Sequence, residues 1–181
     1  MQVTKAAIPD VLIITPKVHG DARGFFFESF NARDFHAACG LTPNFVQDNH
    51  SRSSKGILRG MHYQLTKPQG KLVRVVRGAV FDVAVDMRKS SPTFGKYVGT
   101  ELSEENHAQL WVPPGFAHGF LTLTDSADFI YKTTDYYAPE DEHCVAWNDA
   151  QLNIVWPLVG EPKVSARDAK GVSFASAVAF E

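Results

Sequence analysis

The chain has 181 residues, of which 44% are hydrophobic and 21% charged, with a formal net charge of −2 at pH 7. This length suits one domain with its own core, so we expect residues 1–181 to form a single domain. The composition excludes a disordered chain, and the charge predicts no nucleic-acid partner. No run of aliphatic residues is long enough for a bilayer span and no secretory pattern is visible, so we expect a cytoplasmic protein that does not bind membranes.

Short runs rich in β-branched and aromatic residues, separated by turn signals, predict an all-β chain. The expected strands lie at about 11–18, 24–30, 44–50, 56–65, 71–77, 79–87, 95–102, 108–113, 117–124, 127–137 and 144–148. Many short strands with few helices favour a sandwich or a barrel over a nucleotide-binding βαβ fold.

Two short helical segments interrupt this pattern. The first is expected from Asn31 to Cys39, because Asn31 is a good N-cap and Gly40 a good stop. The second is a single turn at 165–170. Gly78 predicts a tight hairpin between strands 71–77 and 79–87, with Gly78 at positive φ.

Strand 79–87 alternates between two faces. Asp82 and Asp86 share one face with Val80 and Ala84. In a sandwich of two sheets, this polar-lined face could form the inner wall of a cavity instead of a solvent-exposed surface.

Polar chemistry concentrates in four stretches, of which the first is 21–28. Arg23 and Glu28 there bracket three Phe residues. A turn entering an aromatic strand is the simpler interpretation of this stretch alone. Charge beside aromatic faces, however, suits binding of a flat anionic ligand such as a nucleotide.

The second stretch covers 47–64 and contains Arg59, His62 and Gln64, followed by Lys71. Since side chains alternate along a strand, Arg59 and His62 share a face only if Gly60 introduces a bulge. A metal site would need a second His at position 64 and a carboxylate soon after it. Gln64 stands there instead, and no Asp or Glu lies between Gln64 and Asp82, so we expect a scaffold without a bound metal.

The third and fourth stretches are 111–120 and 131–142. A rigid turn of prolines and glycines aims His118 from the start of the next strand, although a His capping a carbonyl would serve as well. Tyr131 is either an amphipathic core residue or, beside a His and a Lys, a general acid.

These motifs together resemble the dTDP-4-dehydrorhamnose 3,5-epimerase family over about residues 3–170. The resemblance rests on nine ordered motifs, at residues 23–26, 49–51, 58–64, 69–74, 114–120, 131–132, 136–137, 147–149 and 167–168. It implies a cupin-type jelly roll and a cofactor-independent enzyme. The implied assembly is a homodimer whose N-terminal strands cross to the partner.

The resemblance also implies an activity and a substrate. The family inverts C3 and C5 of a dTDP-linked 4-keto-6-deoxyhexose, dTDP-4-dehydro-6-deoxy-D-glucose. His62 matches the base, and Asp168 matches the carboxylate that orients it. Lys71 matches the cation near the enolate oxygen, and Tyr131 matches the acid that returns a proton from the opposite face.

Further residues match substrate-binding positions of the family. Arg23 and Arg59 suit the pyrophosphate, and His118 matches a second sugar-site imidazole that Asp82 is expected to orient. The remaining binding positions are Phe26, Glu28, Gln47, Asn49, Tyr137, Glu142 and Arg167. Glu28, Gln47 and Asn49 resemble the thymidine contacts, and Tyr137 resembles the ring that stacks on thymine.

Three other functions stay open at this point. One is a relative that inverts a single carbon, or that acts on another dTDP-4-keto sugar. Another is a nucleotide-sugar binding module without catalysis. The third is a metal-dependent oxygenase on the same scaffold.

Overall fold

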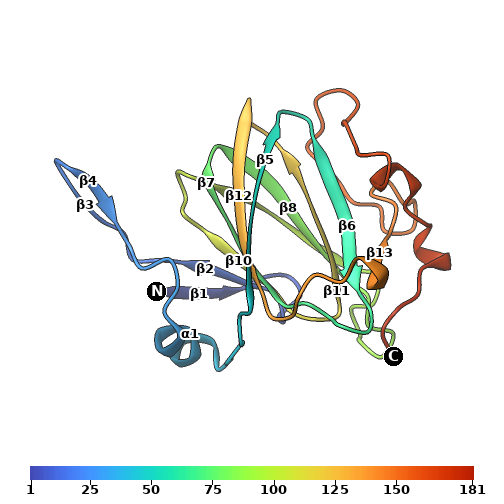
Figure 1. The fold of residues 1–181 in the computed structure, drawn as a ribbon, viewed down its shortest axis with the longest axis horizontal. Coiled ribbons are helices and arrows are strands. Elements are labelled where there is room, and N and C mark those ends of the chain that lie inside the picture. The colour runs from blue at the N-terminus through green and yellow to red at the C-terminus, as the bar shows by residue number, and fades with distance from the viewer.

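The computed structural model describes residues 1–181 as two facing antiparallel sheets with a small hairpin projecting from them (Figure 1). The six-stranded sheet contains, in spatial order, β1 (Gln2–Lys5), β2 (Leu12–Thr15), β10 (Gln109–Val112), β7 (Lys71–Arg77), β12 (Ser126–Thr133) and β5 (Gln47–Ser54). The five-stranded sheet contains β13 (Glu142–Cys144), β6 (Leu58–Gln64), β11 (Phe116–Thr122), β8 (Ala79–Asp86) and β9 (Tyr97–Ser103). The hairpin pairs β3 (His19–Asp21) with β4 (Gly24–Phe26).

The eight strands β5 to β12 have the connectivity of a jelly roll. β5, β7, β10 and β12 belong to the first sheet, and β6, β8, β9 and β11 to the second. Two interlocked four-stranded sheets of this kind define the jelly roll, so the all-β, cupin-type fold is confirmed.

Helices are few and short. α1 (Ala32–Cys39) begins after Asn31, whose side chain accepts a hydrogen bond from Asp34 N, and ends at Gly40 with φ 74°. Both expected ends of this helix are confirmed. The segment 165–170 holds only the 3-10 turn η2 (Asp168–Lys170), and two further turns, η1 (Pro139–Asp141) and η3 (Phe174–Ser176), were not expected. None of these helices has the length and apolar character needed to cross a membrane.

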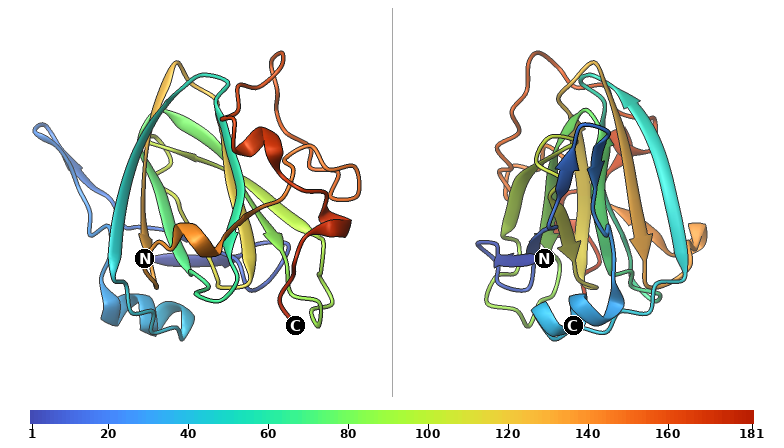
Figure 2. Two further views of the ribbon diagram at one scale, coloured as in Figure 1. Left: turned by 45° about the vertical axis from the view of Figure 1, so that its right-hand side comes forward. Right: turned by 90° about the vertical axis from the view of Figure 1, so that its left-hand side faces the viewer.

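The apolar core has two main layers. Val73, Val80 and Phe129 pack between the two sheets. Met61 and Val85 face the other way and are covered by Trp156 and Phe174 of the C-terminal segment, drawn in orange and red in Figure 2. The five-stranded sheet is therefore packed on both faces. Part of its inner face, on β6 and β11, lines a cavity.

The expected hairpin at Gly78 is wrong. Gly78 has φ 71° as predicted, but β7 pairs with β10 and β12, whereas β8 pairs with β9 and β11. The turn therefore carries the chain from one sheet to the other. A Cβ at Gly78 would lie 2.1 Å from the carbonyl oxygen of Ser126, so the corner has no room for a side chain.

Several expected strand boundaries also change. The predicted strand 24–30 ends at Phe26 and pairs with β3, and β1 and β3 were not expected. The strand expected at 127–137 ends at Thr133. In place of the strand expected at 144–148, the structure has β13 at Glu142–Cys144. Phe25 and Phe26 are 65% and 69% exposed, so the aromatic stretch belongs to a projecting hairpin and not to a core strand.

Candidate active site

A cavity of about 480 Å³ lies among the residues on which most of the sequence-based site predictions fall. Nine of the predicted residues line it: Arg59, His62, Lys71, His118, Tyr131, Tyr137, Glu142, Arg167 and Asp168. They come from both sheets and from the C-terminal segment. This size lies within the range of small-molecule sites in proteins.

A bulge in β6 brings Arg59 and His62 to the same cavity. His62 pairs with His118 of β11, but Arg59 pairs with Phe120, so β6 has one extra residue in this interval. Gly60 lies within this bulge and has φ 124°. A Cβ at Gly60 would lie 2.6 Å from Gly119 Cα. The bulge required by the sequence analysis is therefore present.

His62 and Asp168 form a close imidazole–carboxylate pair. His62 Nε2 lies 2.6 Å from Asp168 Oδ1, and Asp168 is itself held by a hydrogen bond from its backbone N–H to Ser165 Oγ. Burial opposes ionisation of Asp168, but the hydrogen bond from His62 and the nearby charges outweigh it, so the pKa of this carboxyl is lowered. The carboxylate can only accept, so Nε2 carries the proton and Nδ1 keeps its lone pair.

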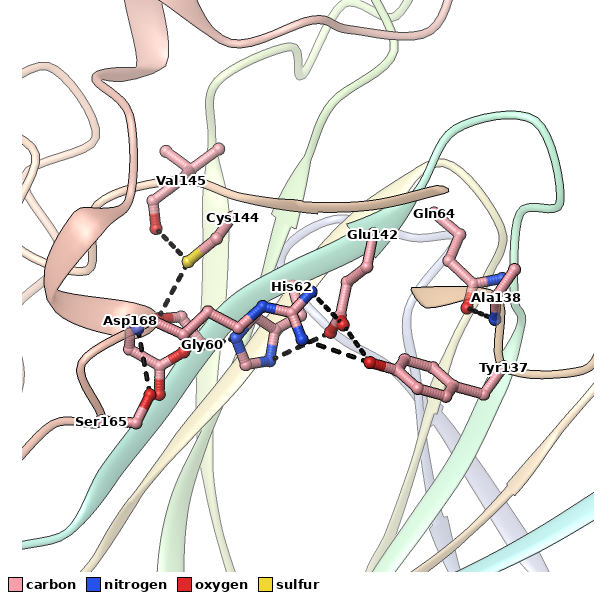
Figure 3. A network of polar contacts seen from close by, with 11 residues as sticks. Gly60, His62, Gln64, Tyr137, Ala138, Glu142, Cys144, Val145, Ser165 and Asp168 are labelled. Atoms are coloured by element: carbon pink, nitrogen blue, oxygen red, sulfur yellow. Dashed lines mark hydrogen bonds and ion pairs between the residues drawn. The ribbon is translucent and has the colours of Figure 1, made fainter. Parts of the chain in front are cut away.

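The free nitrogen of His62 faces a second carboxylate. His62 Nδ1 lies 3.8 Å from Glu142 Oε1 (Figure 3). Glu142 therefore places a negative charge close to the unprotonated nitrogen of His62.

A second imidazole–carboxylate pair lies beside the first. His118 Nε2 lies 2.9 Å and 3.1 Å from the two carboxylate oxygens of Asp82, and both residues are buried. Asp82 lies on the inner face of β8, behind His118, as predicted. Burial raises the pKa of Asp82, although the charges of His118 and Lys71 act in the opposite direction.

Lys71 and Tyr131 stand on the opposite sheet from His62. Lys71 lies on β7 and pairs with Thr133 of β12, two residues from Tyr131. The ammonium of Lys71 takes part in none of the structure's hydrogen bonds or ion pairs, and burial lowers its pKa to about 8, with the carboxylates of Glu142 and Asp82 acting in the opposite direction. Burial, aided by the charge of Glu142, raises the pKa of Tyr131, so its hydroxyl keeps its proton at neutral pH.

Three side chains join across the cavity rim. Tyr137 donates its hydroxyl proton to Glu142 Oε2 at 2.7 Å, and Arg167 donates to the Tyr137 oxygen at 3.2 Å while pairing with Glu142. These contacts tie β13, η2 and the loop after β12 together on one side of the cavity.

The comparisons with known proteins identify the family of this chain. The family model described as dTDP-4-dehydrorhamnose 3,5-epimerase matches residues 5–176. The chain belongs to this family. A dTDP-4-dehydrorhamnose 3,5-epimerase of Pseudomonas aeruginosa is 58% identical over 180 residues, which cover 99% of each chain.

Solved structures of the family superpose closely on this member. The dTDP-6-deoxy-D-glucose-3,5-epimerase of Legionella pneumophila, in complex with dTDP-4-keto-L-rhamnose, gives a TM-score of 0.95 at 52% identity and covers 97% of this chain and 93% of its own. ChmJ, a 3′-monoepimerase from Streptomyces bikiniensis in complex with dTDP-quinovose, gives 0.90 at 36% identity, with coverages of 97% and 88%.

Five predicted binding residues of this family member lie outside the cavity. Gln47 and Asn49 stand next to it: Tyr137 N donates to Gln47 Oε1 at 3.0 Å, and Gln47 Nε2 donates to Asn49 Oδ1 at 2.8 Å. Arg23, Phe26 and Glu28 lie on or just after the projecting hairpin, where Arg23 pairs with its neighbour Asp21. The chain's own cavity does not contain these three.

The sequence reasoning did not assign roles to several residues at the site. Gln64 is buried, donates to the carbonyl oxygens of Lys67 and Tyr136, and accepts from Ala138 N, so it holds the loop that carries Tyr137 (Figure 3). Other polar residues that line the cavity without an assigned role include Ser51, Gln69, Lys163 and Ser165. Gln69 and Gln64 belong to motifs that were recognised, but Lys163 is in a segment without any motif.

Proposed function

We propose that this chain is a cofactor-independent 3,5-epimerase that converts dTDP-4-dehydro-6-deoxy-D-glucose to dTDP-4-dehydro-L-rhamnose. The observation that carries the proposal is the placement of His62 on one sheet and of Lys71 and Tyr131 on the other, around one cavity. Membership of the family supports the same activity.

The first step is proton removal from a carbon next to the C4 ketone. His62 Nδ1 is the base, and Asp168 keeps the imidazole in the tautomer that leaves this nitrogen free. Such a carbon acid is about ten pKa units weaker than imidazolium, a gap on the order of 14 kcal/mol. A base alone does not overcome this gap, so the enolate oxygen must be stabilised as its charge develops.

Lys71 supplies that stabilisation. Lys71 lines the cavity and its ammonium has no partner within the protein, so it keeps its capacity to donate for the O4 oxygen of the sugar. A charged donor of low exposure inside a protein cavity is worth more than the same donor in water. His118, held by Asp82, is a second imidazole that lines the cavity beside the sugar ring.

Tyr131 completes the inversion. If the same face were reprotonated, the result would be exchange with solvent and no epimerisation. Tyr131 stands on the sheet opposite His62, and its raised pKa keeps the proton available for delivery to the other face of the ring. Arg59 and Arg167 are at the cavity and suit the pyrophosphate, because guanidinium groups match its oxygens.

One experiment separates this activity from its alternatives. The protein is incubated with the substrate in deuterated water, the sugar is followed by NMR, and a separate ketoreductase is then added to look for rhamnose. Deuterium at both C3 and C5, together with rhamnose, supports the proposal. The similarity to ChmJ favours a single-carbon epimerase as the second candidate, which would label one carbon only. Binding of dTDP without any exchange would indicate a non-catalytic module.

The substrate contacts predicted at Arg23, Phe26 and Glu28 require a second copy of the chain. These residues are outside the cavity of their own chain, on or just after the hairpin of β3 and β4 that projects from the sheets (Figure 1). Phe25 and Phe26 of this hairpin are exposed. We propose that the hairpin crosses to a second copy and completes the partner's cavity. The arrangement is reciprocal, as two-fold symmetry requires.

Mixing of two inactive variants tests this exchange. Arg23→Ala spoils the hairpin and His62→Ala spoils the cavity. A mixed dimer pairs the intact hairpin of one chain with the intact cavity of the other. After subunit exchange at equal amounts, activity should return to about a quarter of the wild-type value. A mixture that stays inactive, although mixed dimers have formed, would refute the crossing.

We also propose that this chemistry takes place in the cytoplasm. Cys39 and Cys144 are both free thiols. Unpaired cysteines suit a reducing compartment. Fractionation of the source cells with an antibody to the protein would test the location.

A further inference from the structure

The thiol of Cys144 lies beside the proposed catalytic pair without a role in the mechanism above. Cys144 is on β13 and pairs directly with His62 of β6. Its sulfur, one imidazole nitrogen of His62 and one carboxylate oxygen of Asp168 all lie within 4.8 Å of one another. The thiol makes only long contacts, of 3.7 Å, to the carbonyl oxygens of Gly60 and Val145 (Figure 3).

Thiolate, imidazole and carboxylate together form a ligand set for a borderline-soft divalent cation. Around tetrahedral Zn²⁺, bonds of 2.0–2.3 Å place the ligand atoms about 3.3–3.7 Å apart. The widest separation here must close by about 1 Å, and the 2.6 Å contact between His62 and Asp168 must open by somewhat less.

We propose that His62, Cys144 and Asp168 form an inhibitory site for a thiophilic divalent cation, with Zn²⁺ as the occupant. Cys144 also lines a second cavity of about 340 Å³, together with His143 and Lys170. This cavity shares Tyr63, Glu142 and Arg167 with the cavity around the sugar site, so a cation can approach Cys144 from either one.

The binding step balances as a proton exchange. Cys144 loses its thiol proton to the buffer, and neutral His62 moves its N–H to the nitrogen that does not bind the metal. Thiolate and carboxylate then neutralise the two positive charges of the cation. In the metal-free protein, burial and the charge of Asp168 raise the pKa of the thiol to about 11, so Cys144 stays protonated and leaves the His62–Asp168 hydrogen bond intact.

Bound metal would stop proton abstraction. With one nitrogen on the metal and the other carrying the proton, His62 has no lone pair left to act as a base. This inhibitory effect rests on the proposed function of His62, whereas the binding of the cation does not. The two are therefore measured separately.

Binding is tested on the full-length protein with Co²⁺ and Zn²⁺. We expect Co²⁺ to produce a thiolate-to-cobalt charge-transfer absorption and calorimetry to find one Zn²⁺ per chain. Cys144→Ser should lose the absorption and bind Zn²⁺ at least tenfold more weakly, whereas Cys39→Ser, which removes the other thiol of the chain, should behave like the wild type. Cys144→Ala serves as a second variant if the serine form does not fold.

Inhibition is tested in the epimerisation assay. Without added metal, Cys144→Ser should turn over like the wild type. Added Zn²⁺ should inhibit the wild type and Cys39→Ser but not Cys144→Ser. Equal Zn²⁺ affinity with and without Cys144, or no cobalt absorption, would overturn the site. Tight binding without loss of activity would overturn its inhibitory role. Should the wild type lack epimerase activity, the proposed function fails, and the cobalt spectrum still decides whether the site exists.

Discussion

Replacement of Lys71 by methionine should make the protein more stable and much less active. Lys71 is a buried residue of β7 that lines the cavity, and its ammonium has no hydrogen-bond or ion-pair partner in the protein. Burial is the main reason that its pKa falls from 10.5 to about 8. Methionine has a similar length and no charge, so Lys71→Met removes the desolvation penalty without leaving a large void.

The size of the stability gain follows from the pKa. A fall from 10.5 to about 8 corresponds to roughly 3 kcal/mol in the free energy of unfolding. Below pH 8 the side chain is charged in both states, and the folded protein bears the whole penalty. Between pH 8 and pH 10.5 the folded state releases its proton while the unfolded state keeps it, so wild-type stability rises with pH.

The activity should change in the opposite direction. Removal of one donor from an oxyanion-binding site typically lowers kcat by about 10²–10³-fold. Lys71→Met should show a loss of this order, with dTDP affinity little changed, since the proposed contact of Lys71 is with the sugar oxygen. A gain in stability combined with such a loss is the signature of a charge kept for catalysis.

Urea unfolding at pH 7 and pH 10 measures the first effect, and the coupled ketoreductase assay measures the second. The variant should be up to about 3 kcal/mol more stable at pH 7, and the difference should shrink towards pH 10. The exposed Lys55, replaced by methionine, is the matched control and should shift stability by no more than about 0.5 kcal/mol. A Lys71→Met variant that is less stable than the wild type at pH 7, or that keeps its kcat, would refute the reasoning.

Three further outcomes test the assigned roles. His62→Ala should abolish the exchange of substrate protons with deuterated water while dTDP binding, measured by calorimetry, stays within about twofold of the wild type; retained exchange would contradict its role as base. Tyr131→Phe should spare deuterium incorporation more than product formation, so an unaffected rate of epimerisation would remove it as the acid. The value of kcat/KM should fall as pH rises through about 8, because the Lys71 ammonium loses its proton. Lys71→Arg should move this decline to higher pH, because a guanidinium stays charged. If the decline does not move, it belongs to the titration of another group.

Local signals in the sequence predicted local structure well. The cap at Asn31 and the stop at Gly40 bound the only α-helix, and the positive φ of Gly78 was expected. The partners of β7 and β8 could not be predicted, because a glycine turn looks the same whether it closes a hairpin or carries the chain over the edge of a sandwich. The three Phe residues at 25–27 likewise have a core composition, and only the tertiary structure shows Phe25 and Phe26 on an exposed hairpin.

The site was predictable to the extent that its residues belong to recognisable motifs. Strict alternation would have separated Arg59 from His62, and the bulge that joins them depends on the close approach of Gly60 to Gly119 on another strand. Residue spacing does not encode such an approach. The contact of Cys144 with the pair formed by His62 and Asp168 also stayed hidden, because three segments distant in sequence meet there.

The sandwich itself explains why this fold suits the inversion of a carbon centre. Inversion needs one group that removes a proton and another that returns it from the opposite side. Two residues on one strand face lie on the same side of a bound ring, whereas facing sheets put His62 of β6 and Tyr131 of β12 on opposite walls of one cavity. If the base and the acid were both on the same sheet, both groups would lie on one side of the sugar. The protein would then exchange protons with solvent without changing the configuration of the sugar.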